Sequence, residues 1–372
     1  MKVLHVVFLG VLVMSPSGGP ASFANQASDQ ARLEELLGRI VVLNQRGEFT
    51  EAAEVAQEAV KIAEQSFGRE HPAFASSVDQ LGWIYGRLGR FAEGESLSQQ
   101  ALAVREKVFG LDHTDVAISL DNLAAHYLAQ GRYVEAEPLL KRALLINERA
   151  FGPNHSAVAK SLNGLAACYH SQGTTYVSLE IAQAQYANAE PLYKRALMIR
   201  EQILGLEHPE TLDTVNSLGE LYDCLDRLDE AEPLAQRALE GRERLLGPEH
   251  ANTATSMAGL ADIYRKRGRY VQAEPLARQA LSIRERVFGS EHPAVADSLC
   301  VLARILEGGE RDTEAGPLYG CALAIMEKAL PNHPDTARLL EQYAALLRRA
   351  GKAREAEGME LRAKHIRMKA PQ

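Results

Sequence analysis

Cysteine is scarce in this chain of 372 residues, and its four occurrences follow no regular spacing. They are Cys168, Cys224, Cys300 and Cys321, which fall at unrelated positions of the repeat described below. A disulfide framework of the kind that staples small secreted domains therefore does not fit the sequence. We interpret the four as single buried or half-exposed thiols, and the sequence leaves their disulfide state open.

Recognisable catalytic motifs are absent too. The sequence has no nucleophile elbow, Walker loop, His-Glu-x-x-His pair or dinucleotide fingerprint, and its glycines do not cluster into a phosphate loop. His126, His170 and Cys168 come closest to a metal-ligand set. Zinc takes three or four ligands, however, and residues two apart on a helix point away from each other. We therefore predict a non-enzyme without catalytic, cofactor-binding or metal-binding residues.

An excess of positive charge is also lacking, because the net charge is −8 at pH 7. Nucleic acid and anionic lipid surfaces are both negatively charged, so the field of the whole protein favours neither as a partner. The apolar fraction of 46% and the charged fraction of 24% are ordinary for a soluble folded protein.

A single apolar run, residues 3–14, is prominent, and it is too short to span a bilayer comfortably. Lys2 precedes it and the segment SPSGGPASFA follows it, which is the order of a secretory signal with cleavage after Ala24. We predict a signal peptide at 1–24 and a short linker at 25–29. The protein would then be exported, periplasmic or secreted if bacterial, with no stable membrane span after cleavage. An uncleaved anchor or a wrongly assigned start is the alternative.

Most of the remaining chain consists of copies of one 42-residue unit, of which Thr114–His155 is the clearest. Each copy ends in a Gly-x-x-His step or, in the last case, Pro331-Asn332-His333. The marker histidines are His71, His113, His155, His208, His250, His292 and His333. Their spacings of 42, 42, 53, 42, 42 and 41 residues are typical of a solenoid. Recurrence at a link between helices predicts a structural role for these histidines, such as capping the turn.

Each unit contains two helical patterns separated by a glycine. In the unit Thr114–His155, Leu123, Ala124 and Tyr127 share one face of the first helix. Gly131 then ends that helix by taking a left-handed conformation. The second helix carries alanines seven residues apart on its inner face. Each unit is therefore predicted to be a helix-turn-helix.

This order of a small residue, Tyr, Gly-x-Tyr and two alanines resembles the tetratricopeptide repeat. The 42-residue period resembles the longer form found in kinesin light chains and in many bacterial proteins. The resemblance covers residues 30–372 and implies an all-α, right-handed superhelical solenoid of about eight repeats. The expected repeats are 30–71, 72–113, 114–155, 156–208, 209–250, 251–292, 293–333 and 334–372, with altered end units as caps. Asp226 and Glu310 depart from the pattern at the inter-helix glycine, and Gly94 departs at the small alanine.

The interval of 53 residues comes from an insertion of eleven residues between Gly173 and Tyr186, near 174–185. A helical insertion would add about three turns, or roughly 16 Å, and would keep the register of the faces. Thr174, Thr175 and Val177 also allow a loop or an extended excursion. The insertion is either a tolerated lengthening or a lip that contacts a partner.

The concave side of such a solenoid is lined by the first helices and is its usual binding surface. Positions 8, 12 and 16 after each marker histidine share a helical face distinct from the core stripe. By resemblance to kinesin light chain-like repeats, carboxamides in this groove would hold a peptide backbone. Trp83 would add an apolar anchor, and Lys266 and Arg304 would add positive charge for an acidic segment. The predicted groove residues are Asp79, Trp83, Asp121, Asn122, Asn163, Asn216, Lys266 and Arg304.

Together these patterns predict a non-enzymatic scaffold that binds a peptide or a helix of a protein partner in its concave groove. Two alternatives remain. The chain could be a structural component of an envelope or secretion assembly, using its convex surface. It could also be an accessory or regulatory subunit of an enzyme.

Overall fold

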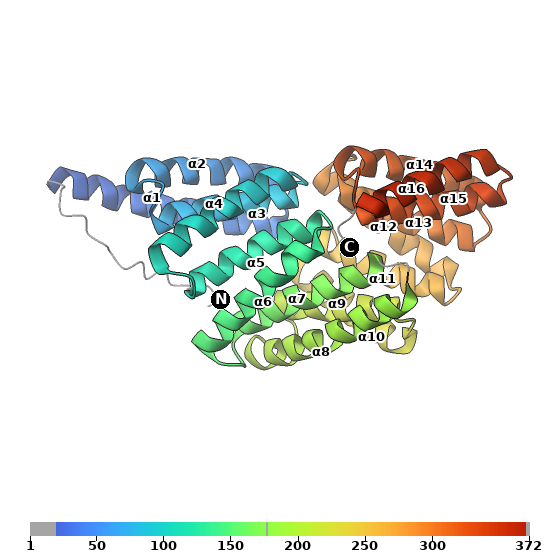
Figure 1. The fold of residues 1–372 in the computed structure, drawn as a ribbon, viewed down its shortest axis with the longest axis horizontal. Coiled ribbons are helices and arrows are strands. Elements are labelled where there is room, and N and C mark those ends of the chain that lie inside the picture. Colours follow the sequence, from blue (N-terminus) through green and yellow to red (C-terminus); the bar gives the residue numbers. More distant parts are fainter. Residues whose placement is uncertain (1–19, 176–177, 370–372) are drawn as a thin grey trace.

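The structure, a computed structural model, describes residues 20–175 and 178–369, and they form sixteen α-helices without a strand (Figure 1). The helices are α1 (Pro20–Arg46), α2 (Phe49–Phe67), α3 (Pro72–Arg87), α4 (Phe91–Phe109), α5 (Thr114–Ala129), α6 (Tyr133–Phe151), α7 (Ser156–Thr175), α8 (Leu179–Ile203), α9 (Pro209–Cys224), α10 (Leu228–Leu246), α11 (Ala251–Lys266), α12 (Tyr270–Phe288), α13 (Pro293–Gly308), α14 (Asp312–Ala329), α15 (Pro334–Arg349) and α16 (Ala353–Lys369). The all-α prediction is confirmed.

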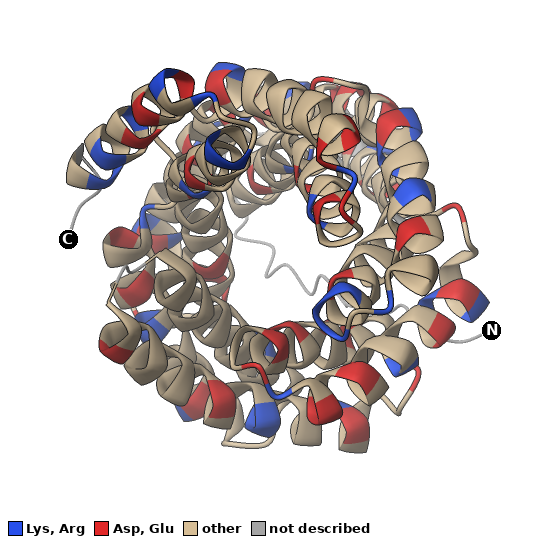
Figure 2. Ribbon diagram, turned by 90° about the vertical axis from the view of Figure 1, so that its right-hand side faces the viewer, with Lys and Arg blue, Asp and Glu red and all other residues tan. Residues whose placement is uncertain are grey.

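The helices pair into successive hairpins, each made of an odd-numbered A helix and the even-numbered B helix that follows it. Each B helix also packs against the next A helix, so the hairpins stack into a continuous array. Successive A helices from α3 to α13 contact one another directly. This arrangement puts the A helices on the inner side of a superhelix, which forms a ring in end view (Figure 2).

Small residues at the hairpin contacts explain the close packing of A and B helices. Ala124 in α5 and Ala136 and Ala143 in α6 are completely buried. Leu123 is also buried in α5 and flanks this contact. A larger side chain at the alanine positions would push the two helices apart, so the repeating small residue sets the geometry of each hairpin.

The marker histidines cap the A helices, as predicted from their position. In the second link, Nδ1 of His113 accepts a hydrogen bond from the backbone N–H of Asp115 at 3.2 Å. The His113 ring also stacks on Phe109, with ring centroids 4.5 Å apart. The same acceptor bond occurs at the other six links, from residues 73, 157, 210, 252, 294 and 335. Each histidine thus satisfies an N–H group that has no intrahelical partner.

The inter-helix turns need a left-handed residue whether or not glycine is present. Gly131 has φ +72°, and the two residues that replace glycine keep this conformation, with φ 58° at Asp226 and 61° at Glu310. Aspartate tolerates this region better than most residues, whereas glutamate is strained there. The backbone of the repeat is therefore maintained at both departures.

The insertion is helical and is shared between two elements. Helix α7 has 20 residues where α5 has 16, and α8 has 25 where α6 has 19. Of the alternatives allowed by the sequence, helical extension is therefore correct and an extended excursion is wrong for the described part. Val177 lies outside the described residues.

At the N-terminus, the predicted signal peptide lies largely outside the described residues, which begin at Pro20. Residues 25–29, expected as a linker, are helical and belong to α1. The division into signal peptide and linker stays a prediction. The described helices include none with the length and apolar character of a membrane span.

Candidate functional site

All eight predicted groove residues lie on A helices, from α3 to α13, but their surroundings differ. Asp79 is only 2% exposed. Its Oδ2 accepts a bond of 2.5 Å from Nη1 of Arg105 in α4, and Ser119 of α5 donates to the same oxygen at 3.2 Å. Since its carboxylate is buried within this packing, the prediction that Asp79 offers itself to a ligand is wrong.

This contact is one member of a recurring set, which we call the inter-repeat nodes. In each node a B-helix side chain donates to a Ser or Thr hydroxyl on the next A helix. The pairs are Arg105–Ser119 at 2.5 Å, Asn147–Ser161 at 3.0 Å, Arg200–Thr214 at 2.5 Å, Arg242–Ser256 at 2.8 Å and Arg284–Ser298 at 3.0 Å. The predicted ladder positions belong to the preceding A helix, so each node can connect two successive repeats.

Asp121 belongs to a node that lacks the arginine. Asn147 stands where Arg105 stands one repeat earlier, so no guanidinium neutralises the buried carboxylate. Ser161 donates to both oxygens, at 3.3 and 3.2 Å. Burial raises the pKa of Asp121 to about 6, against smaller opposing effects of Lys160 and Ser161. Asp121 is therefore a structural group, and its predicted place in an open groove is wrong.

The two ladder asparagines differ from each other. Asn216 is buried, accepts a bond from Ser256 at 3.0 Å and donates to Glu220 at 2.7 Å, so its predicted open position is also wrong. Asn163 is half-buried, and its Oδ1 has no hydrogen-bond partner. Arg200, which could have reached Asn163, binds Glu210 and Thr214 instead. Asn163 thus keeps an unpaired acceptor, which is shielded from solvent in this conformation of the side chain.

The predicted positive charge is neutralised within the array. Nζ of Lys266 lies 3.0 Å from Oδ2 of Asp223, and Nη2 of Arg304 lies 3.4 Å from Oδ1 of Asp262. Each pair bridges two successive A helices. Both cations thus have carboxylate partners within the array, and their binding to an acidic segment stays a prediction.

Trp83 and its neighbours in the next repeats form the open part of the inner side. Trp83 is 40% exposed, although Phe49 contacts its ring edge-on. In α5, Ile118 is 43% exposed, Ala125 is exposed and Asn122 is half-buried. We call Trp83, Ile118, Asn122, Ala125 and Asn163 the inner wall. These five side chains are uncharged, although the guanidinium of Arg87 lies 5.9 Å from the centre of the Trp83 ring. The inner side of α11 and α13 instead carries cations that are ion-paired to the preceding A helix.

Comparison with known proteins explains this geometry. A model of the tetratricopeptide repeat matches residues 32–107, 79–144, 115–175, 174–244, 224–286 and 259–328. The chain belongs to the tetratricopeptide repeat family. The resemblance inferred from the sequence is thus confirmed. No curated protein matches the chain with significance.

Several solved structures are similar to this tetratricopeptide array. Kinesin light chain TPR-like repeats from Podosopora anserina are 26% identical and align over 58% of this chain and 97% of theirs, with a TM-score of 0.43. A Rap protein complexed with Competence and Sporulation Factor is 14% identical over 91% of this chain and 99% of its own, with a TM-score of 0.60. Aspartyl phosphate phosphatase F from Bacillus subtilis is 11% identical over 95% and 96%, with a TM-score of 0.54. At such low identities the last two show the fold alone.

One contact in the tetratricopeptide array was not predicted from the sequence. Nε2 of His170 in α7 lies 3.4 Å from Sγ of Cys224 in α9. Burial raises the pKa of Cys224 to about 11 and lowers that of His170 to about 4, so both groups are neutral near pH 7. This pair is therefore not an activated thiolate. The four cysteines are free, and the described residues include no cluster of three or more metal-ligating side chains.

Proposed function

We propose that this tetratricopeptide array is a non-enzymatic scaffold that binds a polypeptide segment of a protein partner on its inner wall. The observation that carries the proposal is the exposure of Trp83 and Ile118 on the inner side of A helices. Other large apolar side chains are also exposed, such as Val271 at 89% and Leu206 at 60%, but most of them lie on B helices or in the links between helices. Aromatic and aliphatic side chains that are open to solvent on a concave surface are typical anchors for a partner.

Asn163 supplies the polar part of the proposed site. In this structure Oδ1 is unpaired and shielded from solvent, so a ligand reaches it only when the half-buried side chain rotates. After that rotation Oδ1 can accept a hydrogen bond from a peptide N–H, and the amide N–H can donate to a peptide carbonyl. A buried acceptor without a partner costs free energy, which a bound backbone would recover. Asn122 lies on the preceding A helix, so two carboxamides lie on the inner wall in successive repeats.

The relatives motivate the choice of a protein partner. The Rap protein of similar fold is described in a complex with Competence and Sporulation Factor. Aspartyl phosphate phosphatase F carries the name of an enzyme, so the fold alone does not decide the question of catalysis. We place this chain with the non-enzymes because its sequence carries no recognisable catalytic motif and the Cys224 thiol is not activated.

We further propose that the protein is exported through the signal predicted at 1–24. The order of Lys2, the apolar run and the small-residue segment supports this proposal. N-terminal sequencing of the protein from its native host is the test. A mature chain that begins near residue 25 is expected, and an intact Met1 in the cytosol would overturn it.

Substitution of Asn163 and Trp83 tests the inner wall. Asn163→Ala and Trp83→Ala should each weaken the recovery of a partner that co-purifies with the wild-type protein, because each removes a ligand contact. Val271→Ala, on the B helix α12 and away from the inner wall, serves as the control. Asn163→Ala should leave the thermal midpoint nearly unchanged, since Oδ1 bonds nothing within the chain. If Asn163→Ala instead melts the array while recovery stays normal, the proposal fails at this position.

A further inference from the structure

Repeats that are far apart in sequence meet along one line of the superhelix. Phe49, at the start of α2, stacks on Phe288, at the end of α12, with ring centroids 5.9 Å apart and an interplanar angle of 6°. The first repeat therefore contacts the end of the sixth. Three further contacts continue this line at the second, third and fourth repeats, and we call the four contacts together the seam. In Figure 1 the blue helices α2 and α3 end beside the orange helices of the C-terminal half.

At the second repeat, the seam is formed by the marker histidine His292, which makes a hydrogen bond at each of its ring nitrogens. Nδ1 of His292 accepts from the N–H of Ala294 at 3.1 Å, so in the neutral ring the proton is on Nε2. Nε2 lies 3.2 Å from the carbonyl oxygen of Arg87 and donates to it. Burial lowers the pKa of His292 to about 4, which keeps this tautomer neutral. By contrast, His113 caps its helix on the open surface.

At the third repeat, Gly131 lies directly against the start of α15. A β-carbon placed on Gly131 would lie 2.5 Å from Cδ of Pro334 and 3.1 Å from Cδ2 of His333. The equivalent Gly268, in the sixth repeat, has nothing within 4 Å of such a carbon. Both glycines have nearly the same backbone conformation, with φ +72° and +71°. Of these two glycines, Gly131 alone lies where two distant parts of the superhelix approach closely.

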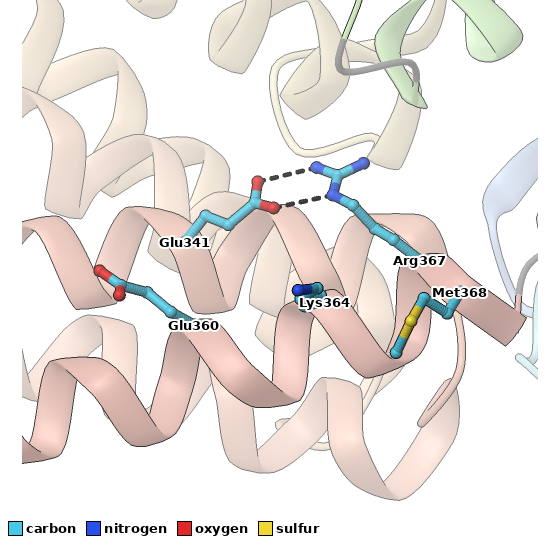
Figure 3. Close-up of a pocket in the computed structure, with 5 residues that line it drawn as sticks. All are labelled: Glu341, Glu360, Lys364, Arg367 and Met368. Carbon is cyan, nitrogen blue, oxygen red and sulfur yellow. Dashed lines mark hydrogen bonds and ion pairs between the residues drawn. The ribbon is translucent and has the colours of Figure 1, made fainter.

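At the fourth repeat, the extra turn of α7 reaches the last helix. Nη1 of Arg367 in α16 donates to the carbonyl oxygen of Thr175, the last residue of α7, at 2.6 Å. This carbonyl is at a helix C-terminus, where a cation is favoured. Glu341 of α15 orients the guanidinium through two bonds of 2.7 Å (Figure 3). The pocket drawn there, of about 460 Å³, lies beside this pair.

Groups on helices that are far apart in sequence also lie close enough to interact electrostatically. The positive charge of Arg338 on α15 lowers the pKa values of His170 on α7 and Cys224 on α9, although burial dominates both. Contacts between the backbones of α7 and α15 agree with this closeness. The last repeat therefore closes the ring of A helices around the inner side.

We infer that the seam is a clasp that holds the superhelical turn closed and limits access to the inner side of the array. The helical insertion is part of this clasp, since its added turn on α7 meets Arg367. The insertion is thereby an internal strut, which is neither of the two roles considered from the sequence. The consequence that a partner loads when the clasp opens rests on the proposed function.

Alkylation of the native cysteines tests the clasp without a ligand. Cys224, the last residue of α9, is exposed to solvent although its Sγ atom lies against His170, and Cys321 is exposed on the B helix α14. A maleimide carrying a long polyethylene glycol chain should modify Cys224 faster in Gly131→Ala and Arg367→Ala than in the wild type. The rate at Cys321 should not change. Scattering measurements should show a larger radius of gyration for both variants.

Two matched variants separate opening of the clasp from general loosening. Gly268→Ala imposes the same backbone cost as Gly131→Ala away from the seam, and Arg348→Ala removes a pair with Glu360 without touching it. Both should react at the wild-type rate, with unchanged circular dichroism. Equal rates for Gly131→Ala and Gly268→Ala would overturn the inference. So would faster modification of Cys224 and Cys321 alike. Because no partner is used, this result is independent of the proposed function.

Discussion

The imidazole of His126 in α5 occupies the space that a β-carbon at Gly94 in α4 would fill. The ring also lies 3.0 Å from the corresponding position at Gly86 in α3. His126 is buried at a position where other repeats have isoleucine, for example Ile84 and Ile263. The departure of Gly94 from the repeat pattern is thus a local adjustment to one large polar side chain.

This relationship predicts a coupled pair. Gly94→Ala should destabilise the protein, because the new methyl group collides with the His126 ring, despite the better helix propensity of alanine. Combining it with His126→Ile restores the side chains of the other repeats. The double variant should be more stable than the sum of the two single effects by about 0.5–3 kcal/mol. Thermal unfolding of all four proteins gives this difference, and strict additivity would disprove the coupling.

The inter-repeat node at Asp79 contains both the arginine and the hydroxyl partner, so truncation of the Asp79 side chain should cause a large loss of stability. Asp79→Ala leaves the guanidinium of Arg105 buried without its counter-charge, and breaking such a pair typically costs about 3–5 kcal/mol. Urea unfolding measures the loss. Asp112→Ala, at an exposed position in the link before α5, is the control and should shift the midpoint only slightly. A similar effect of both changes would contradict the structural role of the node.

Asp121, which is buried without a cationic partner, should make the free energy of unfolding depend on pH. Its pKa in the folded state is raised to about 6, from a usual value of 3.8. Well below pH 4 the carboxyl is protonated in both the folded and the unfolded state, so no charge is buried and stability is not reduced. As the pH rises from 4 to 6, only the unfolded state releases the proton, so stability falls, by about 3 kcal/mol in total.

Asp121→Asn should remove this fall, because the amide oxygen can still accept from Ser161, as Asn216 accepts from Ser256. The variant should match the wild type near pH 4 and exceed it near pH 7. Unfolding curves at intervals between these values provide the test. An unchanged pH profile in Asp121→Asn would show that another group causes the dependence.

Core leucines of two separate repeats should be equally critical. Leu123 and Leu260 are each 4% exposed and pack between helices. Leu123→Ala and Leu260→Ala should each cost about 2–5 kcal/mol, from lost burial and the cavity left behind. Calorimetry or urea unfolding measures the change. Leu361→Ala, at a site 62% exposed, is the control and should be close to neutral.

Much of the fold could be predicted from the sequence because the determinants are local and repeated. The period, the glycine at Gly131 and the capping of α5 by His113 all act within a few residues. The groove was harder to predict. The helical spacing places Asp79 and Asp121 on the groove face, but Arg105 and Ser161, which come from other helices, cover them.

The seam could not be predicted for a related reason. His292 and Arg87 are separated by 205 residues, and the pairing depends on how far each repeat rotates relative to the last. The recurring Ser or Thr fourteen residues after Arg105 and its equivalents was a readable signal for the nodes. This spacing marks the positions that pack between repeats. The inner wall consists of inner-side positions that do not take part in this packing.

Site-specific crosslinking in the native host tests the central claim most directly. A photo-crosslinking amino acid at Ala125 lies on the inner wall, whereas one at Val271 lies on the B helix α12, where the side chain is 89% exposed. Binding on the inner wall predicts a protein adduct at position 125 that identifies a contiguous partner segment, with no such adduct at position 271. An adduct at position 271 alone would contradict the account and point to the outer surface.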